Sequence, residues 1–190
     1  MNIILFFGSF NPIHLGHLIL AQEAALLTNT TEVWLVLSPQ NPFKNTADLL
    51  DEKVRLQILQ KTIAHIPILR ASDIEFDLPK PSYTIQTLES LQQIHPQHHF
   101  KILIGTDILP NLHKWRNYEQ LIHTYEFLVF PRNNYPVVNM PSQYFTLLPT
   151  PIIEISSTQI RDRIKGGLPY AHLVAPETSK EIIDLKCYKH

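Results

Sequence analysis

The 190-residue sequence predicts an α/β fold in which a mostly parallel sheet is covered by helices on both faces. Continuous apolar runs such as Ile3–Phe7 and Val33–Leu37 have the composition of strands that are buried on both faces. Segments with a helical spacing of apolar residues separate these runs, so each strand leads into a helix. The chain is long enough for a continuous core, and we expect residues 1–190 to form a single domain.

The predicted strands and helices alternate along the chain. Runs rich in Val, Ile, Leu and Phe predict strands at 3–7, 33–37, 68–76, 100–104, 126–130 and, last, 145–148 or 152–155. Apolar residues that repeat every three to four positions predict helices at 14–27, 47–65, 84–94, 158–165 and 177–186. The Pro-containing segments 38–46 and 131–151 are expected to be loops. This order is typical of a doubly wound, Rossmann-like sheet, in which ligands bind where loops leave the carboxyl ends of the strands.

Composition and charge exclude several classes of protein. The 16 Lys and Arg nearly balance the 17 Asp and Glu, so no broad basic surface indicates a nucleic-acid partner. The lone cysteine, Cys187, excludes an internal disulfide framework and suits a reducing compartment. No run approaches the roughly 18 apolar residues of a membrane span, and residues 1–7 are too short for a signal sequence. We therefore expect a cytoplasmic protein without a membrane partner.

The loop after the first predicted strand carries the strongest functional signal. Residues 8–17 read GSFNPIHLGH, and His14 and His17 lie on one face of the first helical turn. The N–H groups and the positive end of the helix dipole favour phosphate there, and a bound anion would raise the proton affinity of both imidazoles. Gly8 allows a tight turn, and Gly16 leaves room for a ligand. Incidental capping histidines and a zinc pair are the alternatives, but zinc needs a further ligand and no obvious one adjoins the pair.

A second polar cluster starts the predicted helix at 158–165. Residues 155–161 read ISSTQIR, and Ser157 is the predicted N-cap, with the hydroxyls of Ser156 and Thr158 beside it. Arg161 follows one turn later, and its planar guanidinium suits phosphate oxygens. Taken alone, the segment is an ordinary helix start with a surface arginine. Together with residues 8–17, it would form the second wall of a polyphosphate site.

The two segments together resemble the nucleotidyltransferase superfamily that carries H-x-G-H and I-S-S-T-x-x-R signatures. Three further segments resemble bacterial nicotinate-nucleotide adenylyltransferases: SPQNPFK at 38–44, PSYTIQTL at 81–88, and IGTDIL at 104–109 followed by Trp115. The resemblance runs from residue 3 to about residue 165. The chain departs from the pattern at Asn11, where many relatives carry Asp, and at Phe43, where a His commonly precedes the Lys.

The resemblance implies that the 5′-phosphate of nicotinate mononucleotide attacks the α-phosphorus of ATP, giving deamido-NAD and pyrophosphate. His17 would contact the α-phosphate, and His14, Lys44 and Arg161 would hold the other phosphates. Mg²⁺ is expected to come with ATP, because the sequence shows no dedicated carboxylate cage for a metal. The implied ATP-binding residues are Gly8, Ser9, Phe10, His14, Gly16, His17, Ile155, Ser156, Ser157, Thr158 and Arg161.

For the acceptor, the resemblance implies a pocket beside Asp107 in which the backbone near Tyr83 and Thr84 receives the ring carboxylate. Trp115 would stack on the cationic pyridinium ring, although a tryptophan in this context also suits ordinary packing. Arg132 is expected either to reach a phosphate or to be solvated.

Other acceptors remain open, namely nicotinamide mononucleotide, phosphopantetheine, or an acceptor in a transfer that uses CTP. Trp115 and the PSYT segment favour a pyridine ring over pantetheine. A non-catalytic nucleotide sensor is the alternative from another class, and retention of both histidines, Lys44 and Arg161 speaks against it.

Overall fold

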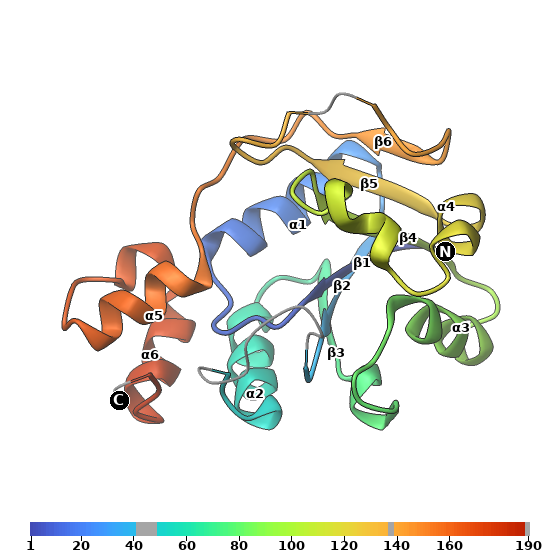
Figure 1. Ribbon diagram of the computed structural model, residues 1–190. Coiled ribbons are helices and arrows are strands. Elements are labelled where there is room, and N and C mark those ends of the chain that lie inside the picture. The colour runs from blue at the N-terminus through green and yellow to red at the C-terminus, as the bar shows by residue number, and fades with distance from the viewer. Residues whose placement is uncertain (41–48, 137–138, 189–190) are drawn as a thin grey trace.

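The computed structural model describes residues 1–40, 49–136 and 139–188. Within these ranges the chain forms a six-stranded sheet in the order β3-β2-β1-β4-β5-β6, and every neighbouring pair is parallel (Figure 1). The strands are β1 (Asn2–Gly8), β2 (Glu32–Leu37), β3 (Leu69–Ser72), β4 (His99–Gly105), β5 (Glu126–Phe130) and β6 (Phe145–Leu147). The predicted doubly wound α/β fold is confirmed.

Alternate side chains of β1 enter two different cores. Ile4 and Phe6 pack in the core that includes buried residues of α1 (Leu15–Leu27), α2 (Glu52–Ile63) and α6 (Pro176–Asp184). Ile3 and Leu5 pack on the other face, with α3 (Thr84–Ile94) and α4 (Tyr118–Thr124). Helices therefore cover both faces of the sheet, which explains why its central strands are apolar throughout.

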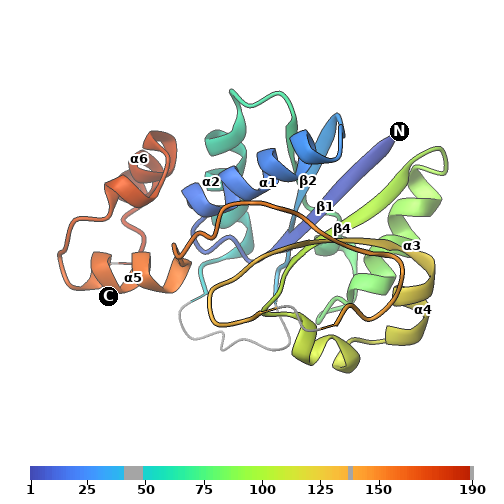
Figure 2. The same cartoon turned by 90° about the horizontal axis from the view of Figure 1, so that it is seen from above.

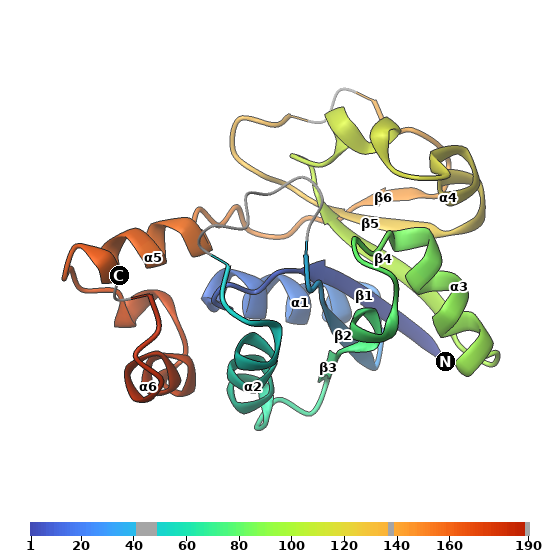
Figure 3. The same ribbon diagram turned by 60° about the horizontal axis from the view of Figure 1, so that its bottom comes forward.

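The C-terminal helices lie far from α3 and α4. Figure 2 shows α5 (Ser157–Lys165) and α6 at one end of the molecule and α3 and α4 at the other. Helix α6 lies beside α2 (Figure 3), and the hydroxyls of Thr62 and Thr178 are 2.7 Å apart between these two helices. Glu181 of α6 accepts hydrogen bonds from Lys61 and Gln57 of α2. These contacts fix the C-terminal segment onto the first half of the chain.

Several element boundaries differ from the prediction. The strand expected at 68–76 ends at Ser72, and a 3-10 helix, η1 (Ile74–Asp77), follows it. Within the described ranges, its four residues pair with residues 33–36 of β2. Helix α2 begins at Glu52 because the Asp51 carboxylate caps it, accepting hydrogen bonds from the N–H groups of Lys53 and Val54. The last strand is β6, the first of the two predicted alternatives.

The neighbours β1 and β4 define the position of a binding crevice. Helix α1 follows β1 on one face of the sheet, whereas α3 precedes β4 on the other face. In sheets of this kind the crevice for a ligand opens where the strand order reverses, which is between β1 and β4 here. The loops that leave Gly8 and Gly105 therefore lie at its mouth. In the described part of the chain, none of the helices combines the length and the apolar composition that crossing a bilayer requires.

Candidate functional site

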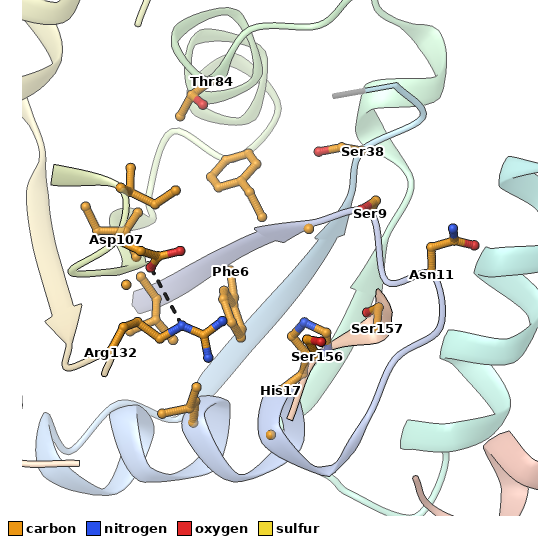
Figure 4. A pocket seen from close by; sticks show the side chains of 18 of the residues that line it. Phe6, Ser9, Asn11, His17, Ser38, Thr84, Asp107, Arg132, Ser156 and Ser157 are labelled. Atoms are coloured by element: carbon orange, nitrogen blue, oxygen red, sulfur yellow. Dashed lines mark ion pairs between the residues drawn. The ribbon is translucent and has the colours of Figure 1, made fainter. Parts of the chain in front are cut away.

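A cleft of about 970 Å³ opens at the carboxyl ends of the strands (Figure 4). Sixteen predicted site residues are described, and all except Phe10 line this cleft. Those that line it are Gly8, Ser9, His14, Gly16, His17, Tyr83, Thr84, Asp107, Trp115, Arg132, Ile155, Ser156, Ser157, Thr158 and Arg161. Lys44, the remaining predicted catalytic residue, lies outside the described residues. Segments far apart in the sequence thus form one site.

The two histidines of the first loop stack on each other. Their ring centroids are 3.7 Å apart, and the backbone N–H of His14 donates to Nδ1 of His17 at 3.3 Å. Because Nδ1 accepts, the proton of neutral His17 is on Nε2, which makes that nitrogen a donor. The His17 ring also packs edge-on against Phe6 and Phe10. Phe10 is 2% exposed, packs against His17 from the core and is not among the residues that line the cleft.

His14 immediately precedes α1 and is buried, with 5% of its surface exposed. Burial, and secondarily the charge of Arg132, lowers its pKa to about 3. These two effects oppose the gain in proton affinity that a phosphate would bring, so His14 is uncharged at neutral pH. Its Nδ1 is buried and has no hydrogen-bond partner among the described residues. His14 nevertheless lines the cleft, so the residue lies where a ligand would bind.

The start of α5 packs directly on the first loop. Ser156, and not the predicted Ser157, is the N-cap: its backbone is extended and its hydroxyl accepts the N–H of Gln159 at 3.1 Å. Ser157 instead donates its hydroxyl to the carbonyl oxygen of Pro12 at 2.8 Å. Arg161 donates from Nη2 to Thr158 at 3.3 Å, and its Nε is buried without a partner in the described ranges. The two predicted phosphate segments therefore form adjoining walls.

Asn11 lies at the back of this wall and is buried. Its side-chain oxygen accepts the hydroxyl of Tyr188 at 2.8 Å and the N–H of Leu50 at 3.3 Å. Burial raises the pKa of Tyr188, so its hydroxyl stays protonated and donates. Asn11 stood out in the sequence only as a departure from Asp, and Tyr188 carried no signal. Both residues connect the first loop to distant parts of the chain.

Arg55 is a second residue that the sequence did not single out. It is 1% exposed and donates to the carbonyl oxygens of Leu50, Ser9, Ser38 and Pro39 at 2.7–2.9 Å. The loops after β1 and β2 are thereby tied to one guanidinium. Burial lowers the pKa of Arg55 from its ordinary value. The sequence did offer one signal: Arg55 lies three and four positions before Ile58 and Leu59, so this cation shares their apolar helix face.

The opposite side of the cleft contains an ion pair. Nε of Arg132 lies 3.7 Å from Oδ1 of Asp107 (Figure 4), and Nη1 of Arg132 donates to the carbonyl oxygen of Ile153 at 3.0 Å. The sequence left two roles open for Arg132, a contact to a phosphate or a solvated position. In the structure Arg132 lines the cleft. A Cβ at Gly105 would overlap Oδ1 of Asp107 and lie 2.9 Å from the Phe130 ring, so a larger residue there would displace these side chains.

Helix α3 and the segment around Trp115 complete this side. Trp115 is partly buried at the end of the 3-10 helix η2 (Leu109–Lys114). Tyr83 precedes α3 with an extended backbone, and the Arg116 guanidinium lies 5.0 Å from the centre of its ring. Figure 4 shows Thr84 and His17 on opposite sides of the cleft. Among the described residues no cluster of three His, Cys, Asp or Glu side chains is arranged to hold a metal ion.

Known proteins resemble this chain in sequence and in fold. The cytidylyltransferase-like family matches residues 5–163. A Cytophaga hutchinsonii protein named "Probable nicotinate-nucleotide adenylyltransferase" is 44% identical over 191 residues and covers 100% of both chains. A protein of the same name from Flavobacterium psychrophilum is 41% identical, again over 100% of both chains. In fold, the chain matches Plasmodium falciparum nicotinic acid mononucleotide adenylyltransferase complexed with NaAD, with a TM-score of 0.82, 21% identity, and coverage of 98% and 97%. The chain belongs to the nicotinate-nucleotide adenylyltransferase family.

Proposed function

We propose that the protein transfers the adenylyl group of ATP to the 5′-phosphate of nicotinate mononucleotide, forming deamido-NAD and pyrophosphate. The observation that carries this proposal is the meeting of two kinds of segment in one cleft. Residues 8–17 and 155–161, of the phosphate-binding type, form one side, and residues 82–84 with Asp107 and Trp115 form the other. The full-length relatives bear the name of this activity.

The reaction needs no nucleophile from the protein. An oxygen of the 5′-phosphate forms a bond to the α-phosphorus, and the bond from that phosphorus to the oxygen that leaves with pyrophosphate breaks. A phosphate monoester is largely dianionic at pH 7, because its second pKa is about 6, so no general base is required. The protein holds the two anions in line and stabilises the charge that develops in the transition state.

We assign this stabilisation to the phosphate side of the cleft. His17 donates from Nε2 to the α-phosphate, where charge develops. His14 and Arg161, which both line this side of the cleft, bind the other phosphates. We also assign Lys44, which lies outside the described residues, to the same phosphates. The remaining contacts to ATP come from residues 8–16 and 155–158.

Family members usually need a divalent metal ion together with ATP. We propose that this ion is Mg²⁺, which would enter with ATP and would offset negative charge on its phosphates.

The acceptor occupies the opposite side of the cleft in this proposal. The indole of Trp115 stacks on the pyridinium ring, where a cationic ring gains cation–π attraction. N–H groups at the start of α3, next to Tyr83 and Thr84, receive the ring carboxylate. Asp107 holds Arg132 in the same pocket, and Arg132 contacts a phosphate. Residues 1–190 act as one nucleotidyltransferase domain, and we place the reaction in the cytoplasm.

A pyrophosphate-release assay with ATP and Mg²⁺ tests the function. Each candidate acceptor is supplied in turn: nicotinate mononucleotide, nicotinamide mononucleotide and phosphopantetheine, with CTP replacing ATP in a parallel series. We expect the highest kcat/KM with ATP and nicotinate mononucleotide, with deamido-NAD as the product. Chelation should abolish turnover, and added Mg²⁺ should restore it. A higher kcat/KM for another acceptor overturns the substrate, and no release with any acceptor favours a nucleotide sensor.

A further inference from the structure

Glu75 is a buried carboxylate whose partners are hydroxyl groups. Only 3% of its surface is exposed, and it lines the cleft on the acceptor side. Ser82 donates to Oε2 at 2.7 Å, and Thr87 donates to Oε1 at 2.8 Å. Within the described residues, no lysine, arginine or histidine forms an ion pair with Glu75. A buried carboxylate without a cation is costly, so an arrangement that keeps one points to a specific task.

The two hydroxyl donors lie on either side of the turn that starts α3. Ser82 immediately precedes Tyr83, the N-cap, and Thr87 lies in the first turn of the helix. The Tyr83 side chain makes no capping hydrogen bond, so the first N–H groups of α3 have no acceptor from the helix itself. Tyr83 and Thr84 line the cleft, whereas Glu75 belongs to the separate helix η1. The carboxylate therefore holds the turn from outside α3, near the positive end of its dipole.

We propose that Glu75 is a positioning residue for the acceptor. By binding Ser82 and Thr87 at the same time, it fixes the turn whose N–H groups receive the ring carboxylate of the mononucleotide. This inference rests on the proposed function. It also assigns a partner to Ser82 and Thr87 of the PSYTIQTL segment, because both hydroxyls bind Glu75 and not the substrate. Thr87 is 0% exposed and does not line the cleft, so its hydroxyl can affect the acceptor only through other residues.

The test compares Thr87→Val with the matched control Thr62→Val. Thr62 is also a buried helical threonine with a hydroxyl partner on another element, Thr178, and it donates to the carbonyl oxygen four residues earlier. We expect Thr87→Val to raise the KM for nicotinate mononucleotide about five- to thirtyfold, with kcat and the KM for ATP within about twofold. Thr62→Val should lower the Tm about as much as Thr87→Val does, and it should leave the KM values for nicotinate mononucleotide and ATP unchanged.

A second variant tests whether Thr87 acts through Glu75. Glu75→Gln keeps the shape of the side chain and removes one strong acceptor, so the KM for the acceptor should rise while the KM for ATP stays the same. Adding Thr87→Val to Glu75→Gln should then raise the KM by less than the product of the two single effects. Fully additive effects, or equal changes in the KM for ATP and for the acceptor, overturn the proposal.

Hydrogen exchange separates this inference from the proposed function. In the protein without substrates, Glu75→Gln and Thr87→Val should speed amide exchange of residues 83–87, whereas Thr62→Val should not. If the wild-type protein accepts another mononucleotide or none, the proposed function fails, and the exchange result still decides whether Glu75 fixes the turn. Unchanged exchange at residues 83–87 in both variants overturns the inference whatever the acceptor is.

Discussion

Nη1 of Arg161 donates a 2.9 Å hydrogen bond to the carbonyl oxygen of Asn11, 150 residues earlier in the chain. This contact joins α5 to the loop after β1, and the Asn11 side chain continues the connection to Tyr188. The guanidinium that we assign to phosphate is therefore oriented by the backbone of the other phosphate segment. Substitutions at Asn11 should accordingly change the KM for ATP more than the KM for the acceptor.

We expect Asn11→Asp to be tolerated, because a carboxylate oxygen accepts the same hydrogen bonds from Tyr188 and Leu50. The kcat/KM should stay within about fivefold of the wild-type value. Asn11→Leu leaves a buried Tyr188 hydroxyl without a partner and should cost about 1–3 kcal/mol in the free energy of unfolding. Urea denaturation with steady-state kinetics on both variants checks this, and a larger loss in Asn11→Asp than in Asn11→Leu contradicts it.

His17→Ala should lower kcat about 10²- to 10³-fold, because its hydrogen bond to the α-phosphate strengthens as charge develops. The dissociation constant for ATP, measured by calorimetry without the acceptor, should change by only about threefold. The exposed His123→Ala serves as a control and should leave both values unchanged. If His17→Ala weakens ATP binding with kcat intact, the assigned role of His17 is wrong.

His14 makes the stability of the protein depend on pH. Its pKa is about 3 in the folded protein, against 6.5 as the ordinary value, so protons bind preferentially to the unfolded chain. The stabilisation is therefore present above pH 6.5 and is lost as the pH falls from there toward 3. Between pH 7 and pH 5, the wild type should lose about 2 kcal/mol more than His14→Asn. Equal losses in chemical denaturation at the two pH values would show that His14 does not titrate in this way.

Arg55→Lys should destabilise the protein by about 2–5 kcal/mol, because an ammonium group cannot reach all four carbonyl oxygens and leaves buried acceptors without partners. The KM for ATP should rise, since Ser9 is among the residues held. Arg163→Lys is the matched control, because this partly exposed arginine donates to the carbonyl oxygen of Pro169 and not to the loops after β1 and β2. Equal urea midpoints for the two variants would exclude a structural role for Arg55.

Gly105→Ala should act on the acceptor alone. The added Cβ overlaps the Asp107 carboxylate and crowds the Phe130 ring, which displaces the Asp107–Arg132 pair. We expect the KM for nicotinate mononucleotide to rise about tenfold or more, with the KM for ATP unchanged. Gly166→Ala is the control, since its Cβ would approach Asp162 only to 3.3 Å, outside the cleft. A rise in the KM for ATP alone contradicts this assignment.

The sequence predicted the sheet and the residues that line the site better than it predicted the buried residues that hold the site loops in place. Apolar runs such as Ile3–Phe7 identify buried strands because burial on both faces excludes polar side chains. The motifs at 8–17 and 155–161 bring local signals of their own, a glycine turn and a helix start. Arg55 brings only its place on an apolar helix face and Tyr188 brings no signal. Most of their partners, the carbonyl oxygens of Ser9, Ser38 and Pro39 and the Asn11 side chain, lie 16 or more residues away. The N-cap moved from Ser157 to Ser156 for a related reason, because Pro12 takes the Ser157 hydroxyl.

The hydrogen bond from Tyr188 to Asn11 has a consequence for synthesis on the ribosome. The loop that follows β1 emerges well before Tyr188, a donor to its Asn11 side chain that lies 177 residues further along the chain. Arg161, which binds the same residue, follows it by 150 residues. A nascent chain released before these residues lacks two of the hydrogen bonds that shape the nucleotide loop, even when its sheet has already formed. Competence to bind ATP thus depends on residues that are made at least 150 residues after the loop itself.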